Sequence, residues 1–336
     1  MKRYLLRTLL YLLPFIAALA YYLFGVDKTA MRGDLGRLSQ TQFHYTHPPL
    51  DPQSHWTACR SVDVVDIAPR AKDELVVFGD SFSAENDYLW PVGRWHQFMG
   101  GALGKRIVMP GFYQYPLEEF LSALTYCPEA LGDTVVLQSG ERMLVYRLCY
   151  LDFDNIARPQ PSTRQASSDD WKKEWRRTSR KPMEYYKKRL GIDMPVGRAH
   201  LSRACFSTRP QELYFYNDDL QHPTGEEYSQ ALAHLRRLDS LAQAYGKTIF
   251  FVAIPDKYTA YRHLMTAMPD TVKRTLASPC LFDSVPCFIN TLPVIDSLVA
   301  SGTLDVYLPD DTHFSIPTAQ AVGQYVARHI FPATGQ

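Results

Sequence analysis

Three signals that point to common kinds of protein are missing from this sequence. Its 36 Lys and Arg nearly balance its 35 Asp and Glu over 336 residues, so no overall charge favours nucleic acid as a partner. Its six cysteines form no C-x-x-C or Cys/His pair at zinc-ligand spacing. It also has no glycine-rich phosphate loop. We therefore expect no nucleic acid partner, no metal and no cofactor, and we look for function in local groups of side chains.

What the sequence does contain first is a basic N-terminus followed by an apolar run. Basic residues at positions 2, 3 and 7 precede the 19 uncharged residues Thr8–Val26. At about 1.5 Å per residue this run spans roughly 28 Å, close to the hydrocarbon thickness of a bilayer. Positive charge stays on the cytoplasmic side. We therefore expect residues 1–26 to be a single-pass anchor in the inner membrane, with the rest of the chain in the periplasm.

A cleaved signal peptide is the alternative, because Ala18-Leu19-Ala20 resembles a small-residue cleavage site. The apolar run continues for six residues beyond that site, which favours an uncleaved anchor. All six cysteines follow the run, as expected for pairing in an oxidising compartment. A disulfide between Cys280 and Cys287 would close a short loop. Six buried free thiols are the other possibility.

The rest of the chain divides by composition. Residues 27–73 mix polar residues and proline without a sustained period, and we expect a stalk there. Between 74 and 336 short apolar runs alternate with helical patterns, except over about 152–222, which we expect to be an insertion or cap. Buried strands are predicted at 75–78, 106–109, 134–137, 248–254 and 304–308. This alternation predicts an α/β domain with a parallel sheet sandwiched by helices.

The first strand ends in Gly79-Asp80-Ser81. In open α/β sheets the carboxyl ends of the strands form the edge where ligands bind. A serine there would be exposed, and N–H groups at the start of the next helix could face a developing oxyanion. Gly-Asp-Ser is also an ordinary turn sequence, so this motif alone is weak.

The complementary residues come about 230 positions later, in Asp310-Asp311-Thr312-His313, between the predicted last strand and the last helix. A serine nucleophile needs a base to take its proton, and the base needs a carboxylate to hold its tautomer. One short loop therefore supplies both groups, and the combination with Ser81 is much more specific than either half.

These blocks resemble the SGNH/GDSL hydrolase superfamily, whose first block is G-D-S and whose last is D-x-x-H. The resemblance implies an SGNH-hydrolase-like, flavodoxin-like fold, with Ser81 as nucleophile, His313 as base and Asp310 as its partner. Asp311 is a rival partner, because the AlgX/AlgJ-type alginate O-acetyltransferases, which are SGNH-like periplasmic proteins, carry D-T-H-W in that element. The order of the blocks follows ordinary SGNH hydrolases and the DltD proteins of teichoic-acid D-alanylation.

Two further stretches are similar to the acetyltransferases. The strand ending in Glu141-Arg142 is similar to their strand with an E-R pair, and the segment from Pro255 to Tyr261 to their P-x-K-x-x-x-Y segment. For Lys257 and Tyr261 the alternative is packing at a helix start.

The middle SGNH blocks are partly missing. Gly111 would stand for the oxyanion-hole glycine, but the Asn of the G-x-N-D block has no counterpart, and Gly140-Glu141-Arg142 occupies its place. Arg142 would then help hold the oxyanion, or would form a structural ion pair.

The resemblance implies acyl transfer, with acetyl the expected group, to a hydroxyl of a cell-surface or secreted polysaccharide through a Ser81 acyl-enzyme. It also implies a multispanning membrane acyltransferase as the partner that supplies the acyl group. A carbohydrate esterase would use the same residues with water as acceptor. A non-catalytic assembly or glycan-binding protein with the same fold is a third possibility.

Overall fold

The computed structural model describes the following residues: 11–16, 33–39, 41, 43–45, 57, 59–62, 73–83, 94–110, 115–158, 196–220, 223–267 and 282–331. The anchor prediction falls mostly outside these ranges, since only 11–16 of residues 1–26 are described. In the described ranges no helix combines the length and the apolar character needed to cross a bilayer.

The centre of the molecule is a parallel sheet of six strands in the order β1-β3-β2-β4-β7-β8. Every neighbouring pair is parallel, as the alternation of strands and helices predicted. The strands are β1 (Cys59–Val62), β2 (Glu74–Phe78), β3 (Arg106–Pro110), β4 (Thr134–Gly140), β7 (Thr248–Ile254) and β8 (Phe288–Asn290). Counted from β2 onward, the order is 2-1-3-4-5, so the chain switches winding direction between β2 and β4.

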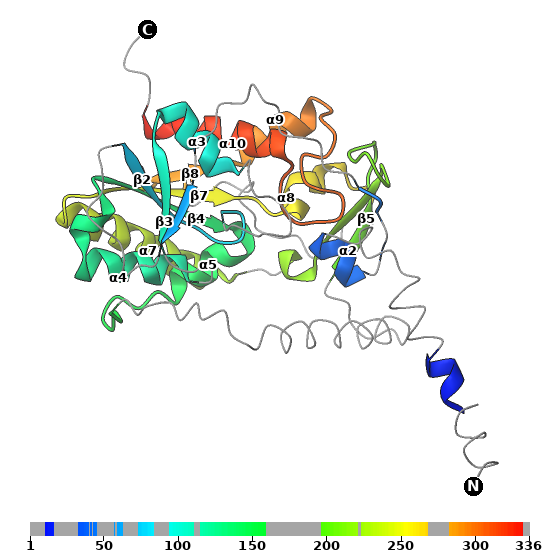
Figure 1. Ribbon diagram of the computed structural model, residues 1–336, viewed down its shortest axis with the longest axis horizontal. Coiled ribbons are helices and arrows are strands. Elements are labelled where there is room, and N and C mark those ends of the chain that lie inside the picture. The colour runs from blue at the N-terminus through cyan, green and yellow to red at the C-terminus, as the bar shows by residue number, and fades with distance from the viewer. Residues whose placement is uncertain are drawn as a thin grey trace.

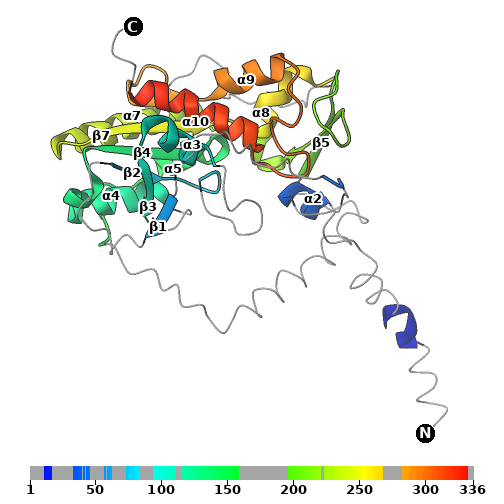
Figure 2. The same ribbon diagram turned by 45° about the horizontal axis from the view of Figure 1, so that its top comes forward.

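Helices cover both faces of this sheet (Figures 1 and 2). Alternate strand residues point to opposite faces: Phe78 joins the core with the first helical layer, and Val77 joins the core with the second. The first layer contains α4 (Pro116–Tyr126), α5 (Glu141–Cys149) and α7 (Gly225–Ala244). The second contains α3 (Trp95–Leu103), α9 (Leu292–Ala300) and α10 (Ile316–Ile330).

Local signals explain where two of these helices begin and how they pack. Thr224 caps α7: its hydroxyl accepts from the Glu227 N–H at 3.2 Å and its own N–H donates to the Glu227 carboxylate at 2.6 Å. Such a cap stabilises a helix by about 1 kcal/mol. In the other layer, a Cβ at Gly323 of α10 would lie 2.2 Å from the Trp95 carbonyl oxygen of α3. Only glycine permits this close helix pairing.

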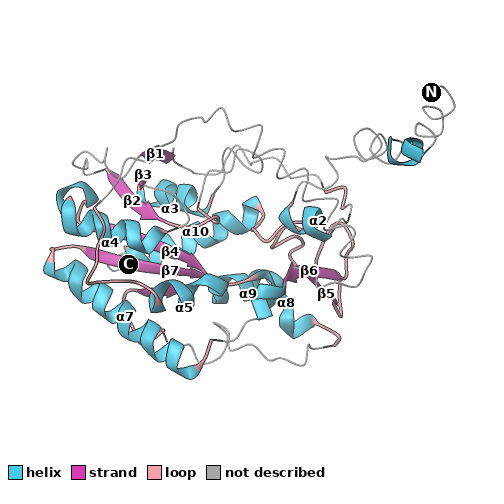
Figure 3. Cartoon of the chain, turned by 90° about the horizontal axis from the view of Figure 1, so that it is seen from below, coloured by secondary structure: helices cyan, strands magenta, loops and turns pink. Residues whose placement is uncertain are grey.

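A smaller unit lies beyond the carboxyl ends of the strands, on the side towards which β7 points (Figures 1 and 3). It contains an antiparallel pair, β5 (Val196–His200) and β6 (Glu212–Tyr216), and the short helices α2 (Asp34–Ser39) and α8 (Lys257–Tyr261). Leu35 of α2 packs with Phe43 and Tyr214 of β6 in a separate apolar cluster. The β5–β6 pair falls within the predicted insertion.

Two predictions about chain segments were wrong. Residues 27–73 are not simply a stalk, because α2 packs into the domain and β1 pairs with β3 at the edge of the sheet. The expected strand Leu304–Leu308 is not a strand either. Among the described residues its one ladder contact is a bridge between Tyr307 and Phe314, and Asp305 adopts a left-handed conformation with φ of 55°. The sheet instead ends with β8.

Four of the described cysteines, Cys127, Cys149, Cys205 and Cys287, are free thiols. Burial raises the pKa of the Cys287 thiol to about 12, so it is unreactive at neutral pH. Its proposed disulfide partner Cys280 lies outside the described residues. Three of these thiols are buried and Cys127 is half-buried, so three of them agree with the alternative of buried free thiols.

Candidate active site

The site lies at the carboxyl edge of the sheet, where β2 and β4 end side by side. Such a switch point is where open α/β sheets bind ligands. Three segments meet there: the turn after β2, the end of β4, and the loop from Leu308 to Ser315 that precedes α10. A fourth segment, the helix α2, contacts that loop from the far N-terminal part of the chain.

The turn that carries Ser81 is held from beneath by Asp80. The Asp80 carboxylate accepts from the backbone N–H of Phe82 at 3.1 Å and of Gly140 at 2.7 Å. It also pairs with Arg147 at 2.7 Å. Burial raises the pKa of Asp80, but the charge of Arg147 and these hydrogen bonds outweigh burial and lower it. Asp80 is therefore a buried structural anion that fixes the turn.

Gln138 of β4 fixes the same turn from the neighbouring strand. Its carbonyl oxygen accepts from the Asp80 N–H at 3.0 Å and the Ser83 hydroxyl at 2.8 Å, and its amide donates to the Asp80 carboxylate at 2.9 Å. This close approach also requires glycine before the turn, since a Cβ at Gly79 would lie 2.4 Å from the Ser83 oxygen. Gln138 was not predicted from the sequence. Its role in holding the Ser81 turn depends on its position at the end of β4, beside Asp80 and Ser83.

Ser81 itself is half-buried at the top of this turn. The next residue, Phe82, packs its ring against His313 at 4.8 Å and Phe314 at 5.0 Å between centroids. The structure therefore brings the serine turn and the histidine loop together at one edge of the sheet. No hydrogen bond joins Ser81 to His313 among the described residues; catalytic hydrogen bonds often tighten only in the substrate complex.

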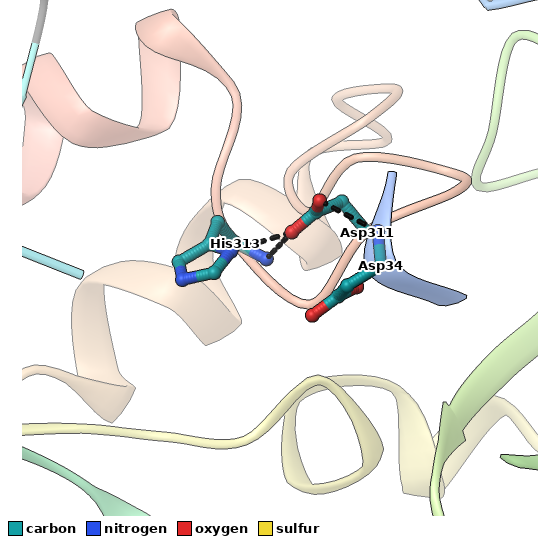
Figure 4. A group of neighbouring side chains, drawn as sticks. All are labelled: Asp34, Asp311 and His313. Atoms are coloured by element: carbon teal, nitrogen blue, oxygen red, sulfur yellow. Dashed lines mark hydrogen bonds and ion pairs between the residues drawn. The ribbon is translucent and has the colours of Figure 1, made fainter. Parts of the chain in front are cut away.

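His313 is held by Asp311. The Asp311 carboxylate lies 2.5 Å from His313 Nδ1 and accepts the His313 backbone N–H at 3.0 Å (Figure 4). Within the described structure the other ring nitrogen, Nε2, is buried without a hydrogen-bond partner. A neutral His313 held in this way carries its proton on Nδ1, which leaves Nε2 free to accept a proton.

The charges of the pair support each other. Burial raises the pKa of the fully buried Asp311 carboxyl, but the charge of His313 and its hydrogen bonds outweigh burial and lower that pKa to about 2. Burial lowers the pKa of His313, but the charge and hydrogen bond of Asp311 outweigh it, so the pKa of His313 is raised. Asp311 is thus a carboxylate at neutral pH, and it stabilises an imidazolium beside it.

Among the described residues no hydrogen bond or ion pair joins Asp310 to His313, although the D-x-x-H alignment implied that Asp310 is the partner. Its carboxylate accepts the Gly33 N–H at 2.9 Å, and its carbonyl accepts the Gly36 N–H at 2.8 Å. Burial raises the pKa of Asp310, and the charge of Asp311 raises it further. Asp310 therefore attaches the loop to α2, while the rival residue Asp311 orients the histidine.

The sequence did not single out Asp34, the first residue of α2. Its carboxylate accepts the Thr312 N–H at 2.9 Å, the Thr312 hydroxyl at 2.7 Å and the Tyr216 hydroxyl at 3.0 Å. Its own N–H donates to Asp311 at 3.0 Å. The only local signal is a short Gly-Asp-Leu-Gly stretch in a region that looked like a linker.

Lys257 and Tyr261 hold the histidine loop from the side of α8. The buried Lys257 ammonium donates to the carbonyls of Leu308, Pro309 and Asp311 at 2.6, 3.0 and 3.1 Å. The Tyr261 hydroxyl accepts the Tyr307 N–H at 3.2 Å. Burial lowers the pKa of Lys257 to about 8, although nearby carboxylates partly offset it. Both side chains thus make specific hydrogen bonds to the histidine loop and the residue just before it, rather than only packing at the start of a helix.

Arg142 is part of an ion pair. Its guanidinium contacts Asp219 at 3.0 Å and lies over the Tyr216 ring at 4.6 Å. Burial lowers the pKa of Arg142, but the charges of Asp256 and Asp219 outweigh it and raise that pKa. These contacts are the structural ion pair that was the alternative to an oxyanion role. Gly111, the other predicted oxyanion residue, lies outside the described residues.

Asp34, Asp311 and His313 are also the one described group whose ligand atoms are close enough to share a metal ion, within 4.8 Å of one another (Figure 4). The two carboxylates and Nδ1 of His313 already have hydrogen-bond partners. Asp311 accepts from His313 Nδ1, and the Asp34 carboxylate accepts three hydrogen bonds from Thr312 and Tyr216. A metal would have to displace these donors, so the geometry favours a hydrogen-bonded network.

Comparisons with protein-family models, with curated proteins and with solved structures find no match to this chain.

Proposed function

We propose that this protein is a serine acyl-transfer enzyme in which Ser81 is the nucleophile, His313 the base and Asp311 the residue that orients the base. One observation carries the proposal. Asp311 holds Nδ1 of His313, while Nε2 is buried with no hydrogen-bond partner among the described residues, and the His313 ring packs against Phe82 of the turn that presents Ser81. Nucleophilic serine hydrolysis needs this division of roles between the two ring nitrogens.

The fold supports this proposal. A strand order of 2-1-3-4-5 is the flavodoxin-like order, and its ligand site lies at the switch point, here between β2 and β4. The Ser81 turn follows β2 directly. The G-D-S and D-x-x-H blocks resemble the SGNH/GDSL hydrolases, and the loop sequence Asp311-Thr312-His313 resembles the D-T-H element of the alginate acetyltransferases.

The proposed reaction has two steps. The Ser81 hydroxyl oxygen attacks the carbonyl carbon of an acyl donor while Nε2 of His313 takes its proton, and the donor's alkoxide leaves with that proton. In the second step a sugar hydroxyl oxygen attacks the acyl carbon and passes its proton to Nε2 of His313, which returns a proton to the Ser81 oxygen as the bond between Ser81 and the acyl group breaks. The product is an O-acylated sugar, with acetyl as the proposed group, and Ser81 is regenerated. Water in the second step would make the protein an esterase.

The proposed acceptor is a cell-surface or secreted polysaccharide in the periplasm. This location follows from the apolar run Thr8–Val26 with its basic flank. A multispanning membrane acyltransferase as the acyl source is supported by the resemblance to the acetyltransferases.

The test is acetyl release from 4-nitrophenyl acetate by the full-length protein in detergent, with and without an oligosaccharide acceptor, compared with Ser81→Ala. Acetylated oligosaccharide that disappears in the variant supports the transferase. Free acetate alone, again lost in the variant, favours the esterase. Equal turnover by both proteins contradicts the proposal and favours a non-catalytic role.

A further inference from the structure

The helix α2 and the histidine loop are joined by hydrogen bonds that run in both directions. Backbone N–H groups of Gly33 and Asp34 donate to the carboxylates of Asp310 and Asp311, across 277 positions of sequence. In return, the backbone N–H and hydroxyl of Thr312 donate to the Asp34 carboxylate. Such reciprocal bonding fixes the loop more rigidly than bonds in one direction.

The fit between the two segments depends on glycine. A Cβ at Gly33 would lie 2.0 Å from the Asp310 carbonyl oxygen, and a Cβ at Gly36 would lie 3.3 Å from the Asp310 Cβ. The backbone at Gly33, just before α2, therefore lies directly against the loop with no room for a side chain, and at Gly36 of α2 the space is tight. This close contact places the Asp34 carboxylate beside Thr312.

Thr312 is the residue between the two members of the histidine pair. Both of its polar donors are bound to Asp34, at 2.9 Å and 2.7 Å. The hydroxyl of Tyr216 from β6 binds the same carboxylate at 3.0 Å. The orientation of Thr312, and with it the relative orientation of Asp311 and His313, therefore depends on Asp34.

The docking of α2 also places the charge of Asp34 near His313. The charged groups that face His313 are Asp311 of its own loop, Asp34 of α2 and Arg142 of α5. The charge of Asp34 acts with that of Asp311 to raise the pKa of His313, whereas Arg142 lowers it. Burial raises the pKa of Asp34, and the charge of Asp311 raises it further, although His313 and the hydrogen bonds from Thr312 and Tyr216 oppose this.

We propose that Asp34 is a positioning residue for the reaction proposed above: it holds Thr312, and through it the Asp311–His313 pair, so the site is complete only when α2 is docked. This inference rests on the proposed function for its kinetic consequence. Its structural consequence, the effect of Asp34 on His313, can be measured without turnover.

The test uses the full-length protein in detergent with ¹⁵N-labelled histidine, in which the His313 signals are assigned by comparison with His313→Gln. The pH midpoint of His313 is measured in wild type and Asp34→Asn. The matched control is Asp73→Asn, which changes an exposed carboxylate at the amino end of β2 that pairs with Arg106. Removing the Asp34 charge should lower the midpoint, while the control should leave it unchanged.

Kinetics on the same proteins provide the second measurement. Hydrogen-bond partners that orient metal-bound histidines are typically worth about 10–100-fold in metal affinity or activity. By the same positioning effect on His313, Asp34→Asn should lower kcat by about 10–100-fold with little change in KM. Asp34→Glu keeps the carboxylate and should recover part of that loss. An unchanged His313 midpoint in Asp34→Asn overturns the inference, as does an unchanged kcat.

A second variant covers the case in which Asp34→Asn does not fold. Thr312→Val removes one donor to Asp34 but leaves the Asp34 carboxylate in place, so it should lower kcat while shifting the His313 midpoint less than Asp34→Asn does. Full activity in this variant also overturns the inference. If wild type and Ser81→Ala turn over equally, the proposed enzyme activity fails, and the His313 midpoints still decide whether Asp34 acts on the histidine.

Discussion

Replacing each of the adjacent carboxylates Asp310 and Asp311 by Asn tests the proposed mechanism most sharply. Asp311 accepts two hydrogen bonds from His313, including the one from Nδ1 at 2.5 Å. In Asp311→Asn an amide NH₂ can face Nδ1, which holds the imidazole with its proton on Nε2. The base then cannot accept the serine proton. A wrong tautomer of this kind costs about 10⁴-fold in kcat, or roughly 5.5 kcal/mol of barrier.

Asp310→Asn is the matched comparison, because the two residues are neighbours and both are buried. The Asp310 carboxylate accepts the Gly33 N–H at 2.9 Å. An Asn side chain keeps a carbonyl oxygen that can accept this bond. We therefore expect Asp310→Asn to lose less than about 10-fold, since a neutral hydrogen bond is worth roughly 1 kcal/mol.

The assay is kcat/KM for acetyl release by the two full-length variants, with circular dichroism to show that both fold. A loss in Asp310→Asn as large as that in Asp311→Asn would refute the assignment of Asp311 as the orienting residue. A loss in neither would refute the proposed role of His313 as the base.

Three further predictions follow from the site. The pKa of His313 is raised above its ordinary value of 6.5 and the base must be neutral, so kcat/KM should fall as pH falls through a midpoint above 6.5; a pH–rate profile with a lower midpoint contradicts this. Gly79→Ala should lower the melting temperature in a thermal scan, because its Cβ would lie 2.4 Å from the Ser83 oxygen. Lys257→Met should cost at least about 2 kcal/mol in urea unfolding, because three buried carbonyls lose their donor, and a smaller cost would show that the loop is held by other contacts.

Much of the α/β framework could be predicted because its signals are local. The strands β2, β3, β4 and β7 are continuous apolar runs, and buried parallel strands need such runs on both faces. The helix α7 begins at a capping box that is visible in the sequence. The strand β1 was not predicted, because it contains charged and polar residues and looked like part of a linker.

The candidate site was partly predictable for the same reason. Ser81 could be predicted because it comes directly after a buried strand, and His313 because it lies in a short loop before a helix. The role of Gln138 was missed, because an amide in a strand has no special pattern. Its function comes from the pairing of β4 with β2, which places it beside Asp80.

The sequence by itself determined the strand–helix alternation and the placement of a serine turn and an Asp-Asp-Thr-His loop at strand and helix ends. It could not decide between Asp310 and Asp311, because adjacent residues in a loop share the same local pattern and differ only in what surrounds them. The tertiary structure favours Asp311, which lies 2.5 Å from His313 Nδ1, while Gly33 just before α2 donates to the Asp310 carboxylate and Asp34 of α2 holds Thr312, 278 positions along the chain. Contacts between segments so distant in sequence leave no periodic or local signal, so they appear only when the chain is folded.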